Sequence, residues 1–261
     1  MPFGYCNLSF IPGRTEPSDK SEMTNQVLFG EHFDIIEDKD NWCKIKLDHD
    51  DYECWVDKKQ IVILTDDDGD GEDSEYLVDE ISPYVEHKSN GTELNLVLGS
   101  LLPPHENGSF TLGGTQYKFN GAISLYNEAS FDEVSEYAHL YLNTPYLWGG
   151  RTPFGIDCSG FTQMVFRMCG IALSRDSHQQ FEEGEEVELL EEAQEGDLAF
   201  FRNEEGRITH VGIIISNQEA DGLSVIHASG KVRIDKLDEK GIYNSDNQEY
   251  SHQLAGIRSY V

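Results

Sequence analysis

Apolar and polar residues alternate with a period of two along the first part of the chain. The alternation is clearest in residues 41–49 (NWCKIKLDH), where cysteine, isoleucine and leucine are separated by lysines. This period is typical of a β-strand with one buried face. Residues 32–40 and 52–64 are predicted strands on either side of it. Short strands at this spacing predict a small β-barrel over residues 1–65.

A second β-rich region follows an acidic stretch. The sequence TDDDGDGEDSE occupies residues 65–75, and short apolar runs such as NLVLGSLLP and GAISLY come after it. We therefore expect a linker and a second small β-barrel over residues 66–128. The acidic stretch resembles the first half of a calcium-binding loop, but Leu77 stands where such a loop needs a bidentate glutamate. A solvated linker is therefore favoured over a calcium site formed by Asp66, Asp68, Asp70 and Gly71.

The pattern becomes helical near residue 130. Ser130 and Glu133 fit a capping box, and the apolar positions that follow recur at helical spacing. A second helical stripe predicts a helix over residues 158–169, with Gly170 at its end. Strand-like runs occupy the remainder, at residues 196–201, 208–216, 223–229, 231–237 and 254–261. Helices followed by antiparallel strands predict an α+β domain over residues 129–261.

Composition and charge narrow the possible partners. The chain has 261 residues, with 19 lysines and arginines against 49 aspartates and glutamates, which gives a net charge of −30. A field of this sign repels nucleic acids and anionic membranes, so neither is an expected partner. The longest wholly aliphatic run, IVIL at residues 61–64, is too short to span a bilayer.

The cysteines and the N-terminal residues bear on the compartment. Five cysteines, an odd number without CxxC spacing, fit free thiols in a reducing environment. The first residues lack the basic start and apolar stretch of a signal peptide. We therefore expect a cytoplasmic monomer with no cofactor and no bound metal; trimming of a leader would instead indicate a periplasmic or secreted protein.

Cys158 is the candidate nucleophile. It follows the glycine-rich sequence YLWGGRTPFGID at residues 146–157 and begins the predicted helix, with Asp157 near the cap. Free backbone N–H groups and the helix dipole at this position stabilise a thiolate, so we expect a lowered pKa. The same N–H groups can hold a developing oxyanion. The competing interpretation is a buried, inert thiol.

Two histidines are placed to act on this cysteine. If residues 208–216 and 223–229 form a hairpin, the numbers of facing residues add up to about 439, and those of His210 and His227 add up to 437. The two histidines are then diagonal neighbours on one face. One can take the thiol proton while the other orients it. Zinc bound by both histidines and Cys158 is the alternative, although no further pattern favours it. Surface or core roles are expected for the other histidines, His32, His49, His87, His105, His139, His178 and His252.

The motifs PYLWGG, DCSGF, RDSHQQ, GDLAFF, THVGIII and VIHASG resemble, in this order, those of the NlpC-type papain-like cysteine peptidases of bacterial cell-wall metabolism. The resemblance covers about residues 129–261. It implies a papain-like domain with Cys158 as the nucleophile, His210 as the base and His227 as the orienting residue. It also implies that Tyr146 assists the oxyanion or the substrate carbonyl.

The sequence RDS is similar to the pocket of γ-D-glutamyl-L-diamino-acid endopeptidases, which grips a free α-amine. The resemblance implies that Asp176 and Ser177 bind this amine, and a carboxylate with a hydroxyl suits an ammonium group. A plain helix cap is the alternative role. The N-terminal barrels are similar to the bacterial SH3-like domains of this subgroup. Further substrate-binding candidates are Trp148, Asp157 and Ser159, with Tyr52 as the aromatic residue that closes the pocket from the first barrel.

The resemblance implies a cysteine endopeptidase that cuts between γ-D-Glu and the diamino acid, diaminopimelate or lysine, of a murein tripeptide or tetrapeptide with a free N-terminal L-Ala. A requirement for the free amine restricts the enzyme to peptides already detached from glycan, which fits cell-wall recycling. Two alternatives remain. One is an exported hydrolase, amidase or acyltransferase acting on intact wall, and the other is a non-catalytic wall-binding protein.

Overall fold

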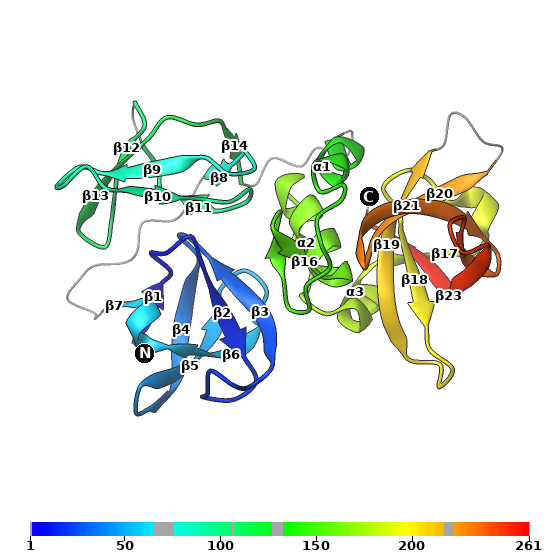
Figure 1. Cartoon of the computed structure of the whole chain (residues 1–261), viewed down its shortest axis with the longest axis horizontal. Helices are drawn as coiled ribbons and strands as arrows, with labels where there is room; N and C mark the ends of the chain where they lie inside the picture. Colours follow the sequence, from blue (N-terminus) through cyan, green and yellow to red (C-terminus); the bar gives the residue numbers. More distant parts are fainter. Residues whose placement is uncertain (1, 65–75, 106, 127–132, 217–221, 261) are drawn as a thin grey trace. The chain divides into compact units, whose positions relative to one another are not determined.

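The computed structural model describes residues 2–64, 76–105, 107–126, 133–216 and 222–260 (Figure 1). The acidic stretch at residues 65–75, for which a linker was favoured over a calcium site, Ser130 of the predicted capping box and residues 217–221 lie outside these residues. The chain divides into two compact units. Unit 1 comprises Met1–Glu128 with Trp148–Pro153, and unit 2 comprises Ala129–Leu147 with Phe154–Val261.

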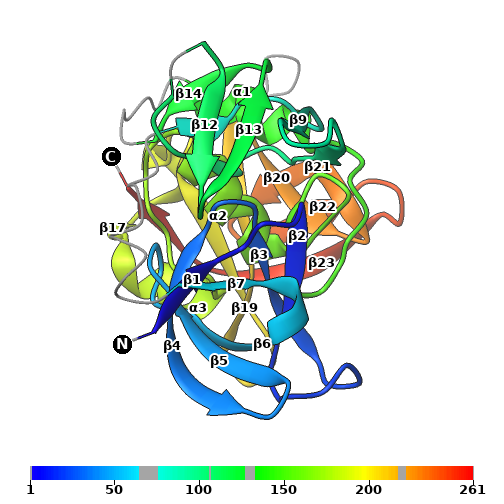
Figure 2. The same ribbon diagram turned by 90° about the vertical axis from the view of Figure 1, so that its left-hand side faces the viewer.

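Unit 1 begins with a seven-stranded antiparallel sheet in the order β3-β2-β6-β5-β4-β1-β7. The predicted alternation is confirmed in β5, because Cys43, Ile45 and Leu47 are buried while the residues between them are partly exposed. Figure 2 shows β4, β5 and β6 side by side. The elements are β1 (Phe3–Tyr5), β2 (Phe10–Arg14), β3 (Met23–Leu28), β4 (His32–Lys39), β5 (Trp42–Leu47), β6 (Glu53–Asp57), the 3₁₀ turn η1 (Lys58–Gln60) and β7 (Val62–Leu64).

The second β-rich region of unit 1 forms two smaller sheets, β10-β9-β13-β12 and β11-β8-β14. Tyr5, Phe29 and Leu64 of the first region share a hydrophobic cluster with Val85 and Phe110 of the second. The two regions therefore have a common core within one unit. The strands are β8 (Tyr76–Val78), β9 (Tyr84–His87), β10 (Glu93–Asn95), β11 (Leu101–Leu102), β12 (Ser109–Leu112), β13 (Thr115–Phe119) and β14 (Ile123–Leu125).

The segment Trp148–Pro153 belongs to unit 1 and carries β15 (Arg151–Thr152). Arg151 is fully buried, and its guanidinium donates two hydrogen bonds of 3.0 Å to the carboxylate of Glu31. It also donates to the backbone oxygen of Gln26 at 2.8 Å. A buried arginine needs such partners, so Glu31 and Gln26 hold this segment in place.

The described residues of unit 2 form three α-helices and a sheet in the order β17-β23-β18-β19-β20-β21-β22, and an additional pairing of β22 with β23 closes the ring of strands. Helices precede strands, as predicted, but strands outnumber helices in the described part of the unit. The elements are α1 (Val134–Leu140), β16 (Gly155–Ile156), α2 (Cys158–Met168), α3 (Ser177–Glu183), β17 (Glu185–Val187), the 3₁₀ turn η4 (Leu190–Glu192), β18 (Leu198–Arg202), β19 (Ile208–Ser216), β20 (Leu223–Ser229), β21 (Lys231–Asp238), β22 (Gly241–Asn244) and β23 (Glu249–Ser259).

Helix α2 positions the candidate nucleophile at its first residue. Its predicted span is confirmed to within one residue, and every residue of the helix is buried. Asp157 caps it by accepting a hydrogen bond of 2.7 Å from the Gly160 N–H. Gly170, with a φ of 75°, ends it in the left-handed conformation that glycine adopts without strain.

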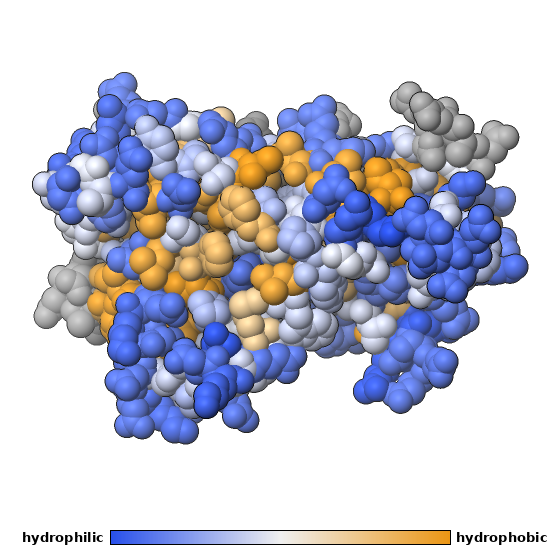
Figure 3. Space-filling view, in the orientation of Figure 1, coloured by the Kyte–Doolittle hydropathy of each residue, from blue (hydrophilic) through white to orange (hydrophobic). Residues whose placement is uncertain are grey.

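Figure 3 shows both kinds of surface on the face that it draws. Hydrophilic residues cover much of this face, and hydrophobic residues gather in large areas among them. None of the described helices has the length and apolar character needed to cross a membrane.

Candidate active site

Cys158 lies at the start of α2, and 6% of its surface is exposed. The pKa of its thiol is raised to about 12, mainly by burial and then by the neighbouring Asp157 carboxylate. The Val211 N–H, Arg175 and the Ser159 N–H lower this pKa by smaller amounts. The expectation of a lowered pKa was therefore wrong, because desolvation of the thiolate outweighs the helix N-terminus. The structure supports a neutral thiol that needs a base.

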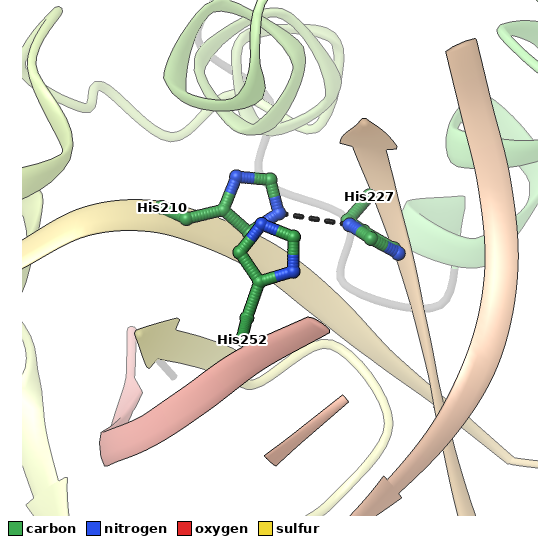
Figure 4. Close-up of side chains that lie close together, drawn as sticks. All are labelled: His210, His227 and His252. Atoms are coloured by element: carbon green, nitrogen blue, oxygen red, sulfur yellow. Dashed lines mark hydrogen bonds between the residues drawn. The ribbon is translucent and has the colours of Figure 1, made fainter. Parts of the chain in front are cut away.

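His210 and His227 lie together as the hairpin register predicts. The register pairs Gly212 with His227, so the numbers of facing residues add up to 439 and His210 is the diagonal neighbour of His227. Nε2 of His210 is 2.8 Å from Nδ1 of His227 (Figure 4). Burial lowers the pKa of His210 well below its usual range, and the neighbouring His227 and His252 lower it further. His210 is therefore a neutral imidazole, able to accept a proton.

Asp235, on β21, extends this pair to a chain of three residues. Nε2 of His227 is 3.0 Å from Oδ2 of Asp235. Arg233 donates to the same carboxylate from Nε at 2.6 Å and from Nη2 at 2.8 Å. Burial alone would raise the pKa of Asp235, but the hydrogen bonds from His227 and Arg233 outweigh it and lower the pKa. Asp235 is therefore an ionised acceptor.

The Asp235 carboxylate sets the tautomers of both rings. A carboxylate only accepts hydrogen bonds, so His227 must donate to it from Nε2. In the neutral His227 ring, Nδ1 then has a lone pair, and Nε2 of His210 must be the donor in the contact between the rings. The remaining nitrogen of His210, Nδ1, consequently has the free lone pair of a general base.

This lone pair faces the side of the sheet on which α2 packs. Helix α2 packs against β19, and the Cys158 thiol is hydrogen-bonded to the N–H of Val211, the residue next to His210. In Figure 4, the nitrogen of His210 that is not bonded to His227 points toward the helical ribbon above the ring. The thiol thus contacts β19 at the residue that follows the base.

The structure also brings His252, on β23, to this cluster. Its ring stacks on that of His210, with the centroids 4.1 Å apart and the planes inclined by 21°. Burial and then His227 lower the pKa of His252 to about 4, against an opposing effect of Asp235. This position beside the two histidines was not predicted for His252, for which only a surface or core role was expected. One ring nitrogen from each of His210, His227 and His252 lies within 4.8 Å of the others, so these residues could hold a metal ion.

Arg175, the first residue of the RDS motif, is buried beneath the nucleophile. It donates to Oδ1 of Asp157 at 3.0 Å and to Oδ2 at 2.6 Å, and also to the Ser159 hydroxyl at 3.0 Å. Asp157 and Ser159, predicted to bind substrate, are therefore engaged in holding the start of α2. Their role toward substrate stays a prediction. Arg175 was not predicted from the sequence, although a lone arginine in a motif otherwise rich in small polar residues could have indicated a buried ion pair.

Asp176 and Ser177 stand at the start of α3. Asp176 is its N-cap, and it forms a capping box with Gln179. Both residues are partly exposed, so their polar groups are not sealed in the core. The structure therefore gives Asp176 the helix-cap role that was the alternative interpretation, and amine binding stays a prediction.

The three aromatic candidates differ in their surroundings. Tyr146 forms an isolated β-bridge with Ile156. Burial and then Cys158 raise the pKa of Tyr146, so its hydroxyl stays protonated and can donate a hydrogen bond near the thiol. Trp148 belongs to unit 1 and is largely exposed. Tyr52, also in unit 1, packs against the core of the first barrel. Pocket roles for Trp148 and Tyr52 stay predictions.

Comparison with known proteins gives matches over both units. Residues 143–249 match the NlpC/P60 family, and residues 13–61 match the bacterial dipeptidyl-peptidase SH3 domain. The chain is 27% identical over 273 residues to the γ-D-glutamyl-L-lysine dipeptidyl-peptidase of Bacillus cereus (strain ATCC 10987), an alignment that covers 94% of this chain and 77% of that protein. It is 29% identical over 214 residues to the protein of the same name from Bacillus subtilis (strain 168), with coverage of 74% and 69%.

A solved structure shares the fold of the whole chain. The crystal structure of an NlpC/P60 family protein from Bacillus cereus ATCC 10987 matches with a TM-score of 0.81 and 21% identity, covering 99% of each chain.

Proposed function

We propose that this chain, a cysteine peptidase of the NlpC/P60 family with a bacterial SH3 domain, hydrolyses the γ-D-glutamyl–L-diamino-acid bond of murein peptides with a free N-terminal L-Ala. The observation that carries the proposal is the chain of hydrogen bonds from Asp235 through His227 to His210. These hydrogen bonds leave a lone pair on Nδ1 of His210. His210 lies on β19, the strand that also contacts the Cys158 thiol. A thiol beside an oriented neutral imidazole provides the nucleophile and the general base that acyl transfer needs.

In the first step, Sγ of Cys158 attacks the γ-carbonyl carbon of the D-glutamyl residue while its proton passes to Nδ1 of His210. The resulting imidazolium donates from Nε2 to His227, which in turn donates to the Asp235 carboxylate. The buried negative charge of Asp235 thereby stabilises the positive charge that develops on His210. The thiol needs this base, because burial raises the pKa of Cys158 to about 12.

In the second step, the oxyanion collapses and the C–N bond to the diamino acid breaks. The His210 imidazolium gives its proton to the leaving amine, and water then attacks the thioester with His210 again as the base. The C–S bond breaks, L-Ala-γ-D-Glu leaves with a new carboxyl group, and the His210 imidazolium returns its proton to the Cys158 sulfur. Backbone N–H groups at the start of α2 and the Tyr146 hydroxyl are the donors that we assign to the oxyanion. The raised pKa of Tyr146 keeps its hydroxyl protonated for this task.

The substrate class rests on the two Bacillus relatives, both named γ-D-glutamyl-L-lysine dipeptidyl-peptidase, and on the RDS motif. We assign the free α-amine of L-Ala to Asp176 and Ser177, at the start of α3. A carboxylate beside a hydroxyl offers an ammonium group a charge-assisted hydrogen bond, which an acylated amine cannot form. This requirement selects peptides released from glycan.

A selectivity for released peptides supports a role in cell-wall recycling, and we place the protein in the cytoplasm as a monomer. Fractionation of the cells that make it and its mass in solution test these two parts separately.

The test compares L-Ala-γ-D-Glu-L-Lys, its diaminopimelate counterpart, their N-acetylated forms and intact sacculi as substrates. Mass spectrometry of the products should show release of the diamino acid from the free-amine peptides, slow release from the acetylated forms and none from sacculi. Cys158→Ala should abolish release. Equal turnover of sacculi and free peptides would contradict the proposed substrate, and full activity of Cys158→Ala would contradict the mechanism.

A further inference from the structure

Three imidazole rings from three strands meet in unit 2, as Figure 4 shows for His210 on β19, His227 on β20 and His252 on β23. One ring nitrogen of each lies within 4.8 Å of those of the other two. His210 and His227 are buried and His252 is partly buried. Within the residues that the structure describes, this is the one such group of histidine, cysteine or acidic side chains. A peptidase of the proposed mechanism needs a base and an orienting residue, and the third ring has no task in it.

Neighbouring side chains hydrogen-bond to His227 and His252 and orient their remaining ring nitrogens as possible metal ligands. His227 donates from Nε2 to Asp235, and a carboxylate behind an imidazole orients the opposite nitrogen as a metal ligand. That nitrogen, Nδ1, lies 2.8 Å from Nε2 of His210. On the third ring, Nδ1 of His252 contacts the Ser251 hydroxyl at 2.9 Å, so its Nε2 can serve as the ligand atom.

We propose that His210, His227 and His252 bind a Zn²⁺ ion that inhibits the peptidase. Three neutral imidazoles suit Zn²⁺, and they leave a fourth coordination position open. Zinc–nitrogen bonds of about 2.0–2.1 Å in a tetrahedral site set the ligand atoms about 3.3 Å apart. The contact of 2.8 Å between His210 and His227 must widen slightly, and the nitrogen of His252 must move closer within its limit of 4.8 Å.

The inhibition follows from the tautomers and rests on the proposed function. A zinc ion takes the lone pair of Nε2 of His210, so the proton of the neutral ring moves to Nδ1. His210 then has no lone pair with which to accept the thiol proton of Cys158. The hydrogen bond from His210 to His227 is broken at the same time. Zinc binding and catalysis are therefore mutually exclusive uses of one nitrogen.

Binding is tested apart from activity, in the full-length Cys158→Ala variant, so that the thiol cannot be a ligand. Calorimetric titration of the chelator-treated protein with Zn²⁺ should show one ion per chain. Adding His252→Gln should weaken the affinity by more than about 100-fold, since loss of a ligand costs more than loss of its supporting partner. The matched control, His139→Gln, removes an exposed histidine on α1 and should change nothing.

A second measurement does not depend on the His252 variant, which could misfold. X-ray absorption at the zinc edge of the Cys158→Ala protein should report three imidazole ligands. No binding, or binding that His252→Gln leaves unchanged in a folded protein, would overturn the site. An absorption spectrum with fewer than three imidazoles would overturn it as well.

Inhibition is measured separately, on the protein with Cys158 in place and a free-amine tripeptide as substrate. Turnover should fall at the Zn²⁺ concentrations at which the ion binds, and a chelator should restore it. His252→Gln should raise the zinc concentration for half-inhibition by more than about 100-fold, in parallel with the affinity. Zinc binding without loss of turnover would refute the inhibition while leaving the site intact. A protein inactive in the absence of zinc would instead refute the proposed function, and the binding measurements would still decide the site.

Discussion

The carboxylate of Asp235 lies 3.0 Å from Nε2 of His227 and is itself held by two hydrogen bonds from Arg233. This contact determines which nitrogen of His227 has a proton. Through the contact of 2.8 Å between the two rings, the tautomer of His227 then determines the tautomer of His210. Asp235 does not approach the reacting atoms in this arrangement. It is a positioning residue, because it acts through two other side chains.

Replacing Asp235 by asparagine should therefore lower kcat much more than it changes KM. The amide group can place an N–H opposite Nε2 of His227, which reverses the tautomers of both rings and removes the lone pair from Nδ1 of His210. A loss in kcat of about 10²–10⁴-fold is the range for a base held in the wrong tautomer. Steady-state kinetics with the free-amine tripeptide measure it.

Arg233→Gln is the matched control, since it leaves the Asp235 carboxylate in place and should reduce kcat by a smaller factor. Thermal unfolding of both variants separates orientation from stability. A kcat for Asp235→Asn within about threefold of the parent, in a folded protein, would refute the tautomer chain.

The reactivity of Cys158 toward iodoacetamide should increase with pH without a plateau near neutrality. Burial raises the pKa of the thiol to about 12, and only the thiolate is nucleophilic. Below the pKa, the thiolate fraction rises tenfold for each pH unit, so the rate of alkylation should do the same between about pH 6 and pH 10. Peptide mapping distinguishes Cys158 from the four other free cysteines. A rate that is already constant near pH 7 would instead indicate a resting thiolate–imidazolium pair.

Arg175→Met should destabilise unit 2, because it leaves the buried carboxylate of Asp157 without its bidentate partner. Removal of one member of a buried ion pair costs about 3–5 kcal/mol. Adding Asp157→Asn should recover part of this loss, since asparagine is neutral and still caps α2. Urea denaturation of the parent, the single variants and the double variant completes the cycle. Additive effects of the two substitutions would show that the pair is not coupled.

Asp176→Asn should separate amine binding from helix capping. Asparagine caps a helix as well as aspartate does, so stability should be nearly unchanged. Loss of the charge-assisted hydrogen bond to the α-amine, about 1.5–3 kcal/mol, should lower kcat/KM on free-amine peptides by about 10–100-fold. The reference is the turnover of the N-acetylated peptide, which should change little. Equal losses on both peptides would leave Asp176 with a structural role alone.

The sequence predicts the local parts of this site well. The start of α2 at Cys158 follows from the glycine-rich approach and the helical stripe, and the register of the β19–β20 hairpin follows from its short connection. Asp235 was not predicted from the sequence, although the same register argument would have reached it. Around the turn at Gly230, His227 pairs with Arg233, so Asp235 is again a diagonal neighbour of the histidine.

Other parts of the site depend on tertiary structure and could not be predicted in this way. His252 reaches His210 because β23 pairs with β18, a strand far away in the sequence, and no hairpin rule fixes this pairing. The pKa of Cys158 depends on how completely the folded chain excludes water, whereas the sequence shows only the helix start. Burial therefore reverses a shift that the local pattern predicts.

The covalent intermediate tests the proposed chemistry most directly. Rapid acid quench of the enzyme with L-Ala-γ-D-Glu-L-Lys, followed by intact-mass and peptide mass spectrometry, should reveal an L-Ala-γ-D-Glu acyl group joined to Cys158 as a thioester. Asp235→Asn should slow its formation, and Cys158→Ala should not form it. Hydrolysis of the peptide by Cys158→Ala, or an acyl group on another residue, would contradict the assignment of Cys158 as the nucleophile.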